Sequence, residues 1–211
     1  MNIIKTRKIN WKNKRRIILL EKNYNVIILT ILIGFGIVIG ALIFSKTTSD
    51  LNNSIDVLYD NFVSSAREKS FISNFTDTFI NSMVYLFLFF IMGTNAVGIP
   101  FIYFITCIKG IGNGIISGYL YSTFGLQGVG FSTLVIFPYA LISGIIVILM
   151  GDSSIKLSKN IFLSMTGKSY TESEITIKKY CINFIIYTAF FIVASMIDAI
   201  FKVSFSNTFN I

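Results

Sequence analysis

The chain of 211 residues contains no histidine and only two cysteines. The lack of histidine excludes the catalytic sets and metal sites that depend on an imidazole. Cys107 and Cys181 each lie in an apolar segment, so we expect no structural disulfide. HExxH, P-loop and CxxC motifs are also missing, and Asp198 alone cannot supply the carboxylate pair of an intramembrane aspartyl site. We therefore expect no enzymatic activity, no cofactor and no metal site.

Charged residues are also scarce, at 13% of the chain against about 25% in soluble domains. The stretch from Thr78 to Gly151 has a single charged side chain, Lys109. Apolar runs of ~20 residues span a bilayer as helices, and lipid permits only helices or closed barrels. The runs here are continuous rather than alternating, which favours helices. The sequence therefore predicts an all-α polytopic membrane helix bundle.

Five apolar segments satisfy the length of a transmembrane helix. We expect spans at about 26–44, 78–95, 99–124, 131–150 and 180–201, which form one membrane domain. Amphipathic spacing over 51–62 and 155–165 adds two short interfacial helices.

Glycine and proline mark the breaks between the central spans. Gly98 and Pro100 favour a sharp reversal between the second and third spans, since proline suits the first turn of a helix. Gly125 and Gly128 predict a tight turn over 125–130. Pro138 lies inside the fourth span, where we expect it to kink the helix and free a carbonyl group.

The distribution of basic residues predicts the orientation. Thirteen Lys and Arg lie in the tail 1–25 and the loop 152–179, against four in the first loop and the tail 202–211. The positive-inside rule then places the N-terminus in the cytoplasm and the short C-terminal tail outside. The net charge of +8 accordingly indicates contact with membrane lipids rather than with nucleic acid.

Glycines recur every four residues in the third span. Gly110, Gly114 and Gly118 therefore share one helix face, with Asn113 and Ser117 close by. Small residues let a second helix approach to backbone contact. We favour packing against the second or fourth span, with a homodimer or partner-docking face as the alternative. A weaker pair of the same kind, Gly36 and Gly40, lies in the first span.

Lys109 lies near the middle of the third span, where a lysine costs at least about 2.5 kcal/mol. We expect hydrogen bonds within the bundle, with a transporter's anion site or a side chain that snorkels to the interface as alternatives. Asp198 is the one carboxylate inside another span, but near its outer end, so it is expected to lie far from Lys109. A freed carbonyl near Pro138 is the other candidate partner, and Asp198 with Lys202 is expected to form a surface pair.

The order of these motifs resembles the stage II sporulation protein M family. The motifs are Gly98-Ile99-Pro100, Lys109-Gly110, Gly114, Gly118, Gly125-Leu126-Gln127-Gly128, Phe137-Pro138 and Met150-Gly151. The close match covers about 93–151, whereas 1–45 and the first loop match poorly.

The resemblance implies a non-enzymatic scaffold in the mother-cell membrane of an endospore former. It would anchor peptidoglycan-degrading partners, stage II sporulation proteins D and P, at the septum during engulfment. The competing interpretation is a small transporter, or a transporter subunit, that uses Lys109 in a polar cavity.

Overall fold

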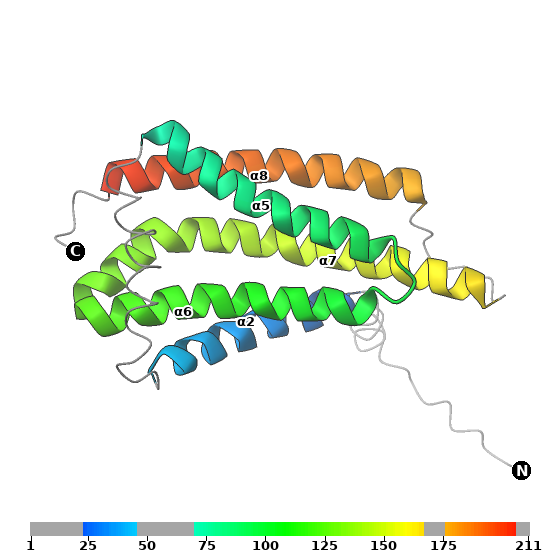
Figure 1. Cartoon of the computed structure of the whole chain (residues 1–211), viewed down its shortest axis with the longest axis horizontal. Coiled ribbons are helices and arrows are strands. Elements are labelled where there is room, and N and C mark those ends of the chain that lie inside the picture. Colours follow the sequence, from blue (N-terminus) through cyan, green and yellow to red (C-terminus); the bar gives the residue numbers. More distant parts are fainter. Residues whose placement is uncertain (1–22, 46–69, 167–175, 206–211) are drawn as a thin grey trace, which may run out of the picture.

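A computed structural model of the chain describes residues 23–45, 70–166 and 176–205, and the described part is helical throughout apart from short turns. The helices are α2 (Tyr24–Ser45), α5 (Phe71–Gly93), α6 (Ile99–Phe131), the π-helical turn η3 (Ser132–Ile136), α7 (Phe137–Met165) and α8 (Ile177–Phe205) (Figure 1). Five candidate membrane spans, long and apolar enough to cross a bilayer, confirm the predicted fold class. The expected amphipathic helix over 51–62 and both terminal tails lie outside the described residues.

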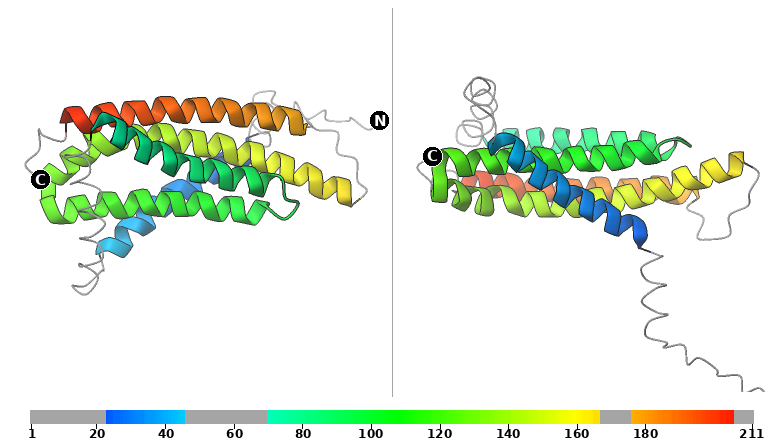
Figure 2. Two further views of the ribbon diagram at one scale, coloured as in Figure 1. Left: turned by 45° about the horizontal axis from the view of Figure 1, so that its top comes forward. Right: turned by 90° about the horizontal axis from the view of Figure 1, so that it is seen from below.

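The helices lie side by side along the long axis of the molecule, and α7 packs against each of the other four (Figures 1 and 2). α2 lies mainly against α6, whereas α5, α7 and α8 pack on one another. We call the two ends of the bundle the Pro100 end, where α5 is joined to α6, and the Gly125 end. α5 and α6 lie close at the Pro100 end and diverge toward the Gly125 end (Figures 1 and 2).

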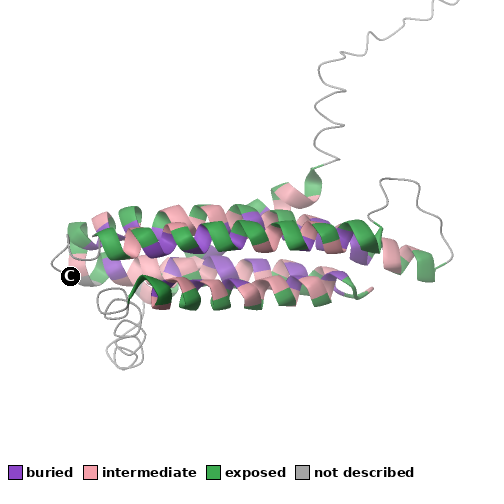
Figure 3. Ribbon diagram, turned by 90° about the horizontal axis from the view of Figure 1, so that it is seen from above, coloured by how far each residue is buried: buried purple, intermediate pink, exposed green. Residues whose placement is uncertain are grey.

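The core is densest toward the Pro100 end, where large side chains are fully enclosed. All five long helices contribute to this core, with Leu29, Phe89, Ile102, Met150 and Tyr180. The outward faces also carry many large apolar side chains, among them Phe35, Phe87, Phe104 and Ile185 (Figure 3). Apolar groups on both faces suit a bundle whose surroundings are lipid rather than water.

The turn at the Pro100 end follows the sequence prediction. Gly98 precedes the first helical residue of α6, and Pro100 lies in the first turn. A Cβ on Gly98 would collide with the carbonyl oxygen of Met92, so the tight return of the chain requires glycine there. The side chain of Asn95 supports the turn by accepting a hydrogen bond from the amide of Val97 at 3.3 Å.

The reversal at the Gly125 end is sharper than the turn predicted over 125–130. Only Gly125 leaves the helical region, with φ 55° and ψ −128°, and the following residues are helical again. Gly128 then packs against the carbonyl of Leu120. Pro138 lies inside the candidate span Phe124–Met165, as predicted, and in the first turn of α7. The π-helical turn η3 precedes it and makes the span irregular there. A proline lacks the N–H group that would bond to the carbonyl oxygen of the preceding turn. A π-helical turn gives such carbonyl oxygens other backbone donors.

α7 also extends further than the predicted fourth span. We expected a separate interfacial helix over 155–165, but these residues continue α7 without a break to Met165. Ile155 and Leu157 are buried, because the segment packs beneath other helices instead of lying alone.

Candidate functional site

The glycine face of α6 packs inside the bundle, against α2. A Cβ on Gly110 would overlap the carbonyl oxygen of Ile33, and one on Gly114 would overlap that of Ile37. Gly118 is less tightly held, since its Cβ would lie 3.2 Å from the Cα of Ala41. The neighbour is thus the first span, not the second or fourth span that the sequence suggested.

The weaker glycine pair of the first span is the other half of this contact. A Cβ on Gly36 would collide with the carbonyl oxygen of Cys107, and one on Gly40 with that of Ile111. The two helices therefore meet backbone to backbone, as small residues allow in membranes. Ser117 lies apart from this contact and accepts a long hydrogen bond of 3.5 Å from the hydroxyl of Ser132.

Lys109 is 6% exposed, and its amine faces aromatic rings rather than a carbonyl near Pro138. The Nζ atom lies 4.5 Å from the ring centroid of Tyr85 and 5.6 Å from that of Tyr139. Such contacts are worth about 0.5–2 kcal/mol each, so they offset only part of the cost of a cation at this depth. No ion pair to Lys109 is found within the described ranges.

Asp198 is 2% exposed, so the expected surface pair with Lys202 is in fact buried. Its Oδ2 atom lies 2.6 Å from Lys202 Nζ and accepts a hydrogen bond of 2.6 Å from the hydroxyl of Thr78. Lys202 also donates to that hydroxyl at 3.2 Å. The expectation failed because α5 packs over the end of α8 and brings Thr78 onto the carboxylate.

A polar cavity of about 220 Å³ opens between α5, α6, α7 and α8, toward the Gly125 end. Its polar lining comprises Asn74, Asp77, Thr78, Asn81, Lys109, Asn113, Tyr139, Asp198 and Lys202. The structure therefore places Lys109, Asn113 and Asp198 around one space, although the sequence suggested that Lys109 and Asp198 lie apart.

A chain of hydrogen bonds extends along one wall of this cavity. Tyr139 and Ser82 share a hydrogen bond of 2.9 Å, and Ser82 donates to the carbonyl oxygen of Thr78 at 2.8 Å. Thr78 in turn donates to Asp198, so the wall joins α7 to α5 and α5 to α8. The sequence analysis named Asp198 but missed Thr78, Ser82 and Tyr139, although Asn74, Thr78, Asn81 and Tyr85 recur at helical spacing.

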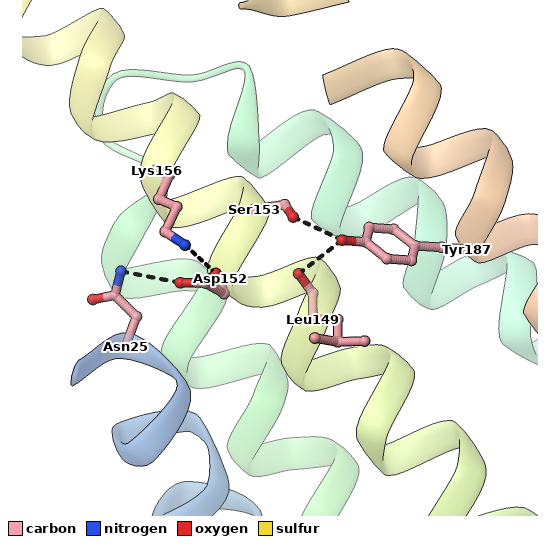
Figure 4. A network of polar contacts seen from close by, with 6 residues as sticks. All are labelled: Asn25, Leu149, Asp152, Ser153, Lys156 and Tyr187. Carbon is pink, nitrogen blue, oxygen red and sulfur yellow. Dashed lines mark hydrogen bonds and ion pairs between the residues drawn. The ribbon is translucent and has the colours of Figure 1, made fainter. Parts of the chain in front are cut away.

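A second polar network lies on α7 nearer the Pro100 end (Figure 4). Asp152 pairs with Lys156 at 2.5 Å and accepts a hydrogen bond of 3.4 Å from Asn25, which ties α2 to α7. The hydroxyl of Tyr187 lies 2.8 Å from that of Ser153 and also donates to the carbonyl oxygen of Leu149 at 3.3 Å. These contacts hold helices together.

Tyr180 forms the third polar contact between helices. Its hydroxyl donates to the carbonyl oxygens of Phe89 and Phe90 at 3.1 and 3.2 Å and lies 3.1 Å from the hydroxyl of Ser154. A Cβ on Gly93 would collide with this ring, so the glycine makes room for the tyrosine. The described residues contain no group of three or more Cys, Asp and Glu that could hold a metal ion, and Cys107 and Cys181 are free.

Comparison with known proteins identifies a family that the chain matches. A family model described as "Stage II sporulation protein M" matches residues 29–201. This range includes the greater part of each of the five long helices. No curated protein and no solved structure matches the chain.

Proposed function

The chain belongs to the stage II sporulation protein M family of membrane proteins, and from this membership we propose that it is a membrane scaffold in endospore formation. The observation that carries the proposal is the family match over 29–201, which extends far beyond the motifs of the two turns. The family is not a known enzyme family. The scaffold would hold peptidoglycan-degrading partners, by resemblance stage II sporulation proteins D and P, at the septal membrane during engulfment.

The use of the polar side chains supports a scaffold rather than an enzyme. Asp152, Asp198, Tyr180 and Tyr187 each bond to a neighbouring helix or to their own helix, so their polar groups are engaged in holding the bundle together. The orientation that we propose, with the N-terminus in the cytoplasm, places the Gly125 end on the extracytoplasmic side. The polar cavity would then face the compartment in which the septal wall is thinned.

Deletion of the gene in its sporulating host tests this proposal. We expect the deleted cells to stop at engulfment, with a septal membrane that does not migrate around the forespore, and the intact chain supplied in trans to restore migration. Immunoprecipitation in mild detergent should recover the two partner proteins from wild-type cells. Normal engulfment in the deleted strain, in a host with no redundant wall-degrading route, would exclude the sporulation function.

A transporter is the second candidate, because the cavity reaches Lys109 as that function requires. The fully buried cluster of Phe89, Ile102 and Met150 lies toward the opposite end of the bundle and argues against a continuous path. Asn113→Cys, in a chain with Cys107 and Cys181 replaced by Ala, distinguishes the two functions. A scaffold should expose the new thiol to a membrane-impermeant reagent from one side only, whereas a transporter should expose it alternately from both.

A further inference from the structure

We propose that the polar cavity binds a carboxylate side chain from a transmembrane helix of a partner protein, with Lys109 as the counter-ion. The inference rests on the proposed scaffold function and specifies where and how the scaffold would hold a partner. It concerns four charged groups that line one cavity, Asp77, Lys109, Asp198 and Lys202.

Lys109 has no directly paired carboxylate among the described residues, although Asp198 attracts it electrostatically across the cavity. Asp198 is engaged at one carboxylate oxygen by both Lys202 and Thr78, at 2.6 Å each, so this pair compensates itself. Asp77 is exposed and lies in the first two turns of α5, at the Gly125 end. Lys109 instead lies buried near the middle of the candidate span Ile99–Ser122, where its amine faces the rings of Tyr85 and Tyr139.

A buried cation at this depth is best compensated by a carboxylate, since ionisable groups within membranes pair with one another. Asn113 lies one helical turn beyond Lys109 on the same face of α6 and also lines the cavity. Its amide can donate a hydrogen bond to a carboxylate that the lysine holds. The cavity of about 220 Å³ has room for one acidic side chain but not for a helix.

The shape of the bundle favours an acid carried on a helix over a small soluble acid. α5 and α6 diverge from the Pro100 end (Figures 1 and 2). Residues of both helices line the cavity, together with Tyr139 of α7 and Asp198 of α8. Asn81 of α5 is exposed at the rim of the cavity, within a candidate membrane span. An exposed amide is costly against lipid, but it can bond to a polar group on a neighbouring helix. A partner helix seated where α5 and α6 diverge would cover Asn81 and insert its acid toward Lys109.

The test uses the purified full-length chain in lipid nanodiscs and a fluorescent transmembrane peptide of leucine and alanine with one central Glu. The reference peptide has Gln at the same place. Energy transfer from a dye on the chain measures binding. We expect the Glu peptide to bind at least tenfold more tightly than the Gln peptide. Lys109→Met should abolish this preference, whereas Lys109→Arg should retain it because it keeps the charge.

Lys156→Met is the matched control, because Lys156 pairs with Asp152 outside the cavity and its loss should leave the preference unchanged. Lys109→Asp tests the pairing in the other direction and should favour a peptide with central Lys over the Glu peptide. Equal binding of the Glu and Gln peptides to the wild-type chain would overturn the proposal, as would a Glu preference that survives Lys109→Met in a monodisperse sample. Binding of soluble glutarate to the wild-type chain, without any preference between the two peptides, would also overturn the proposal. It would indicate a small-molecule site.

The two proposals fail in different ways. If the peptide shows no preference but deletion still blocks engulfment, the scaffold function stands and the carboxylate site does not. If the preference is found but deleted cells engulf normally, the site stands as a helix-binding site and the sporulation function does not.

Discussion

Gly36 and Gly110 pack backbone against backbone, since a Cβ on Gly36 would lie 3.0 Å from the Cα of Gly110, and one on Gly110 would lie 3.1 Å from the Cα of Gly36. Each glycine therefore makes room for the other helix. This contact holds α2 on the bundle, and α2 makes most of its contacts with α6. The first span, in which the sequence analysis found few of the family's motifs, is thus joined to the motif-rich third span.

Enlarging Gly110 should separate these helices. Gly110→Leu is expected to destabilise the fold by at least about 1–3 kcal/mol, because the side chain would meet backbone atoms that cannot move aside. Thermal unfolding in detergent measures the loss, and crosslinking between cysteines placed on α2 and α6 reports the separation directly.

Gly112 provides the matched control two residues away. An added Cβ at Gly112 meets nothing within 4 Å, and the residue is exposed. Gly112→Leu should therefore leave both the unfolding temperature and the crosslink unchanged. Equal effects of the two substitutions would contradict the interface between α2 and α6.

The reversal at Gly125 should depend on its backbone conformation rather than on space. Its φ of 55° is strained for any residue with a side chain, although nothing lies within 4 Å of an added Cβ. Gly125→Ala is expected to cost about 1–2 kcal/mol. An added Cβ at Gly144 also meets nothing within 4 Å, but this residue lies within the helical run of α7. Gly144→Ala should therefore be neutral or stabilising, since alanine favours helix. A neutral Gly125→Ala in thermal unfolding would show that the reversal has another cause.

The sequence predicted the five spans because each is a long apolar run, and that pattern is local. The glycine spacing likewise indicated that α6 has a close-packing face, but not that α2 lies on it, because helix pairing depends on all five helices at once. Lys109 was found as an isolated charge. Thr78 and Tyr139 were not, because threonine and tyrosine are common in membrane helices and become part of a site only through contacts distant in sequence.

The buried ion pair should be more sensitive to the loss of one partner than to the loss of both. Lys202→Met removes the direct ion-pair partner of the buried Asp198 but leaves its hydrogen bond from Thr78, and we expect a loss of about 3–5 kcal/mol. The double variant, with Asp198→Leu added, removes the unpaired charge and should recover much of that loss. Thermal unfolding of the two single variants and the double variant gives the coupling energy.

The corresponding pair of Asp152 and Lys156 serves as the comparison. Lys156 is 36% exposed at its side chain, so water can solvate the charges when the pair is broken. Lys156→Met should cost about 1 kcal/mol or less. A cost as large as that of Lys202→Met would mean that burial does not distinguish the two pairs.

Tyr180 should stabilise the bundle through its hydroxyl as well as its ring. The hydroxyl reaches two carbonyl oxygens on α5 and the hydroxyl of Ser154 on α7, so one atom of α8 joins three helices. Tyr180→Phe keeps the ring and removes these bonds, and we expect a loss of about 1–3 kcal/mol because the acceptors are buried. Tyr121→Phe, at a residue 63% exposed, is the control and should change stability little. If both variants unfold at the wild-type temperature, the ring alone accounts for the packing of α8 against α5, and the hydroxyl contributes nothing measurable.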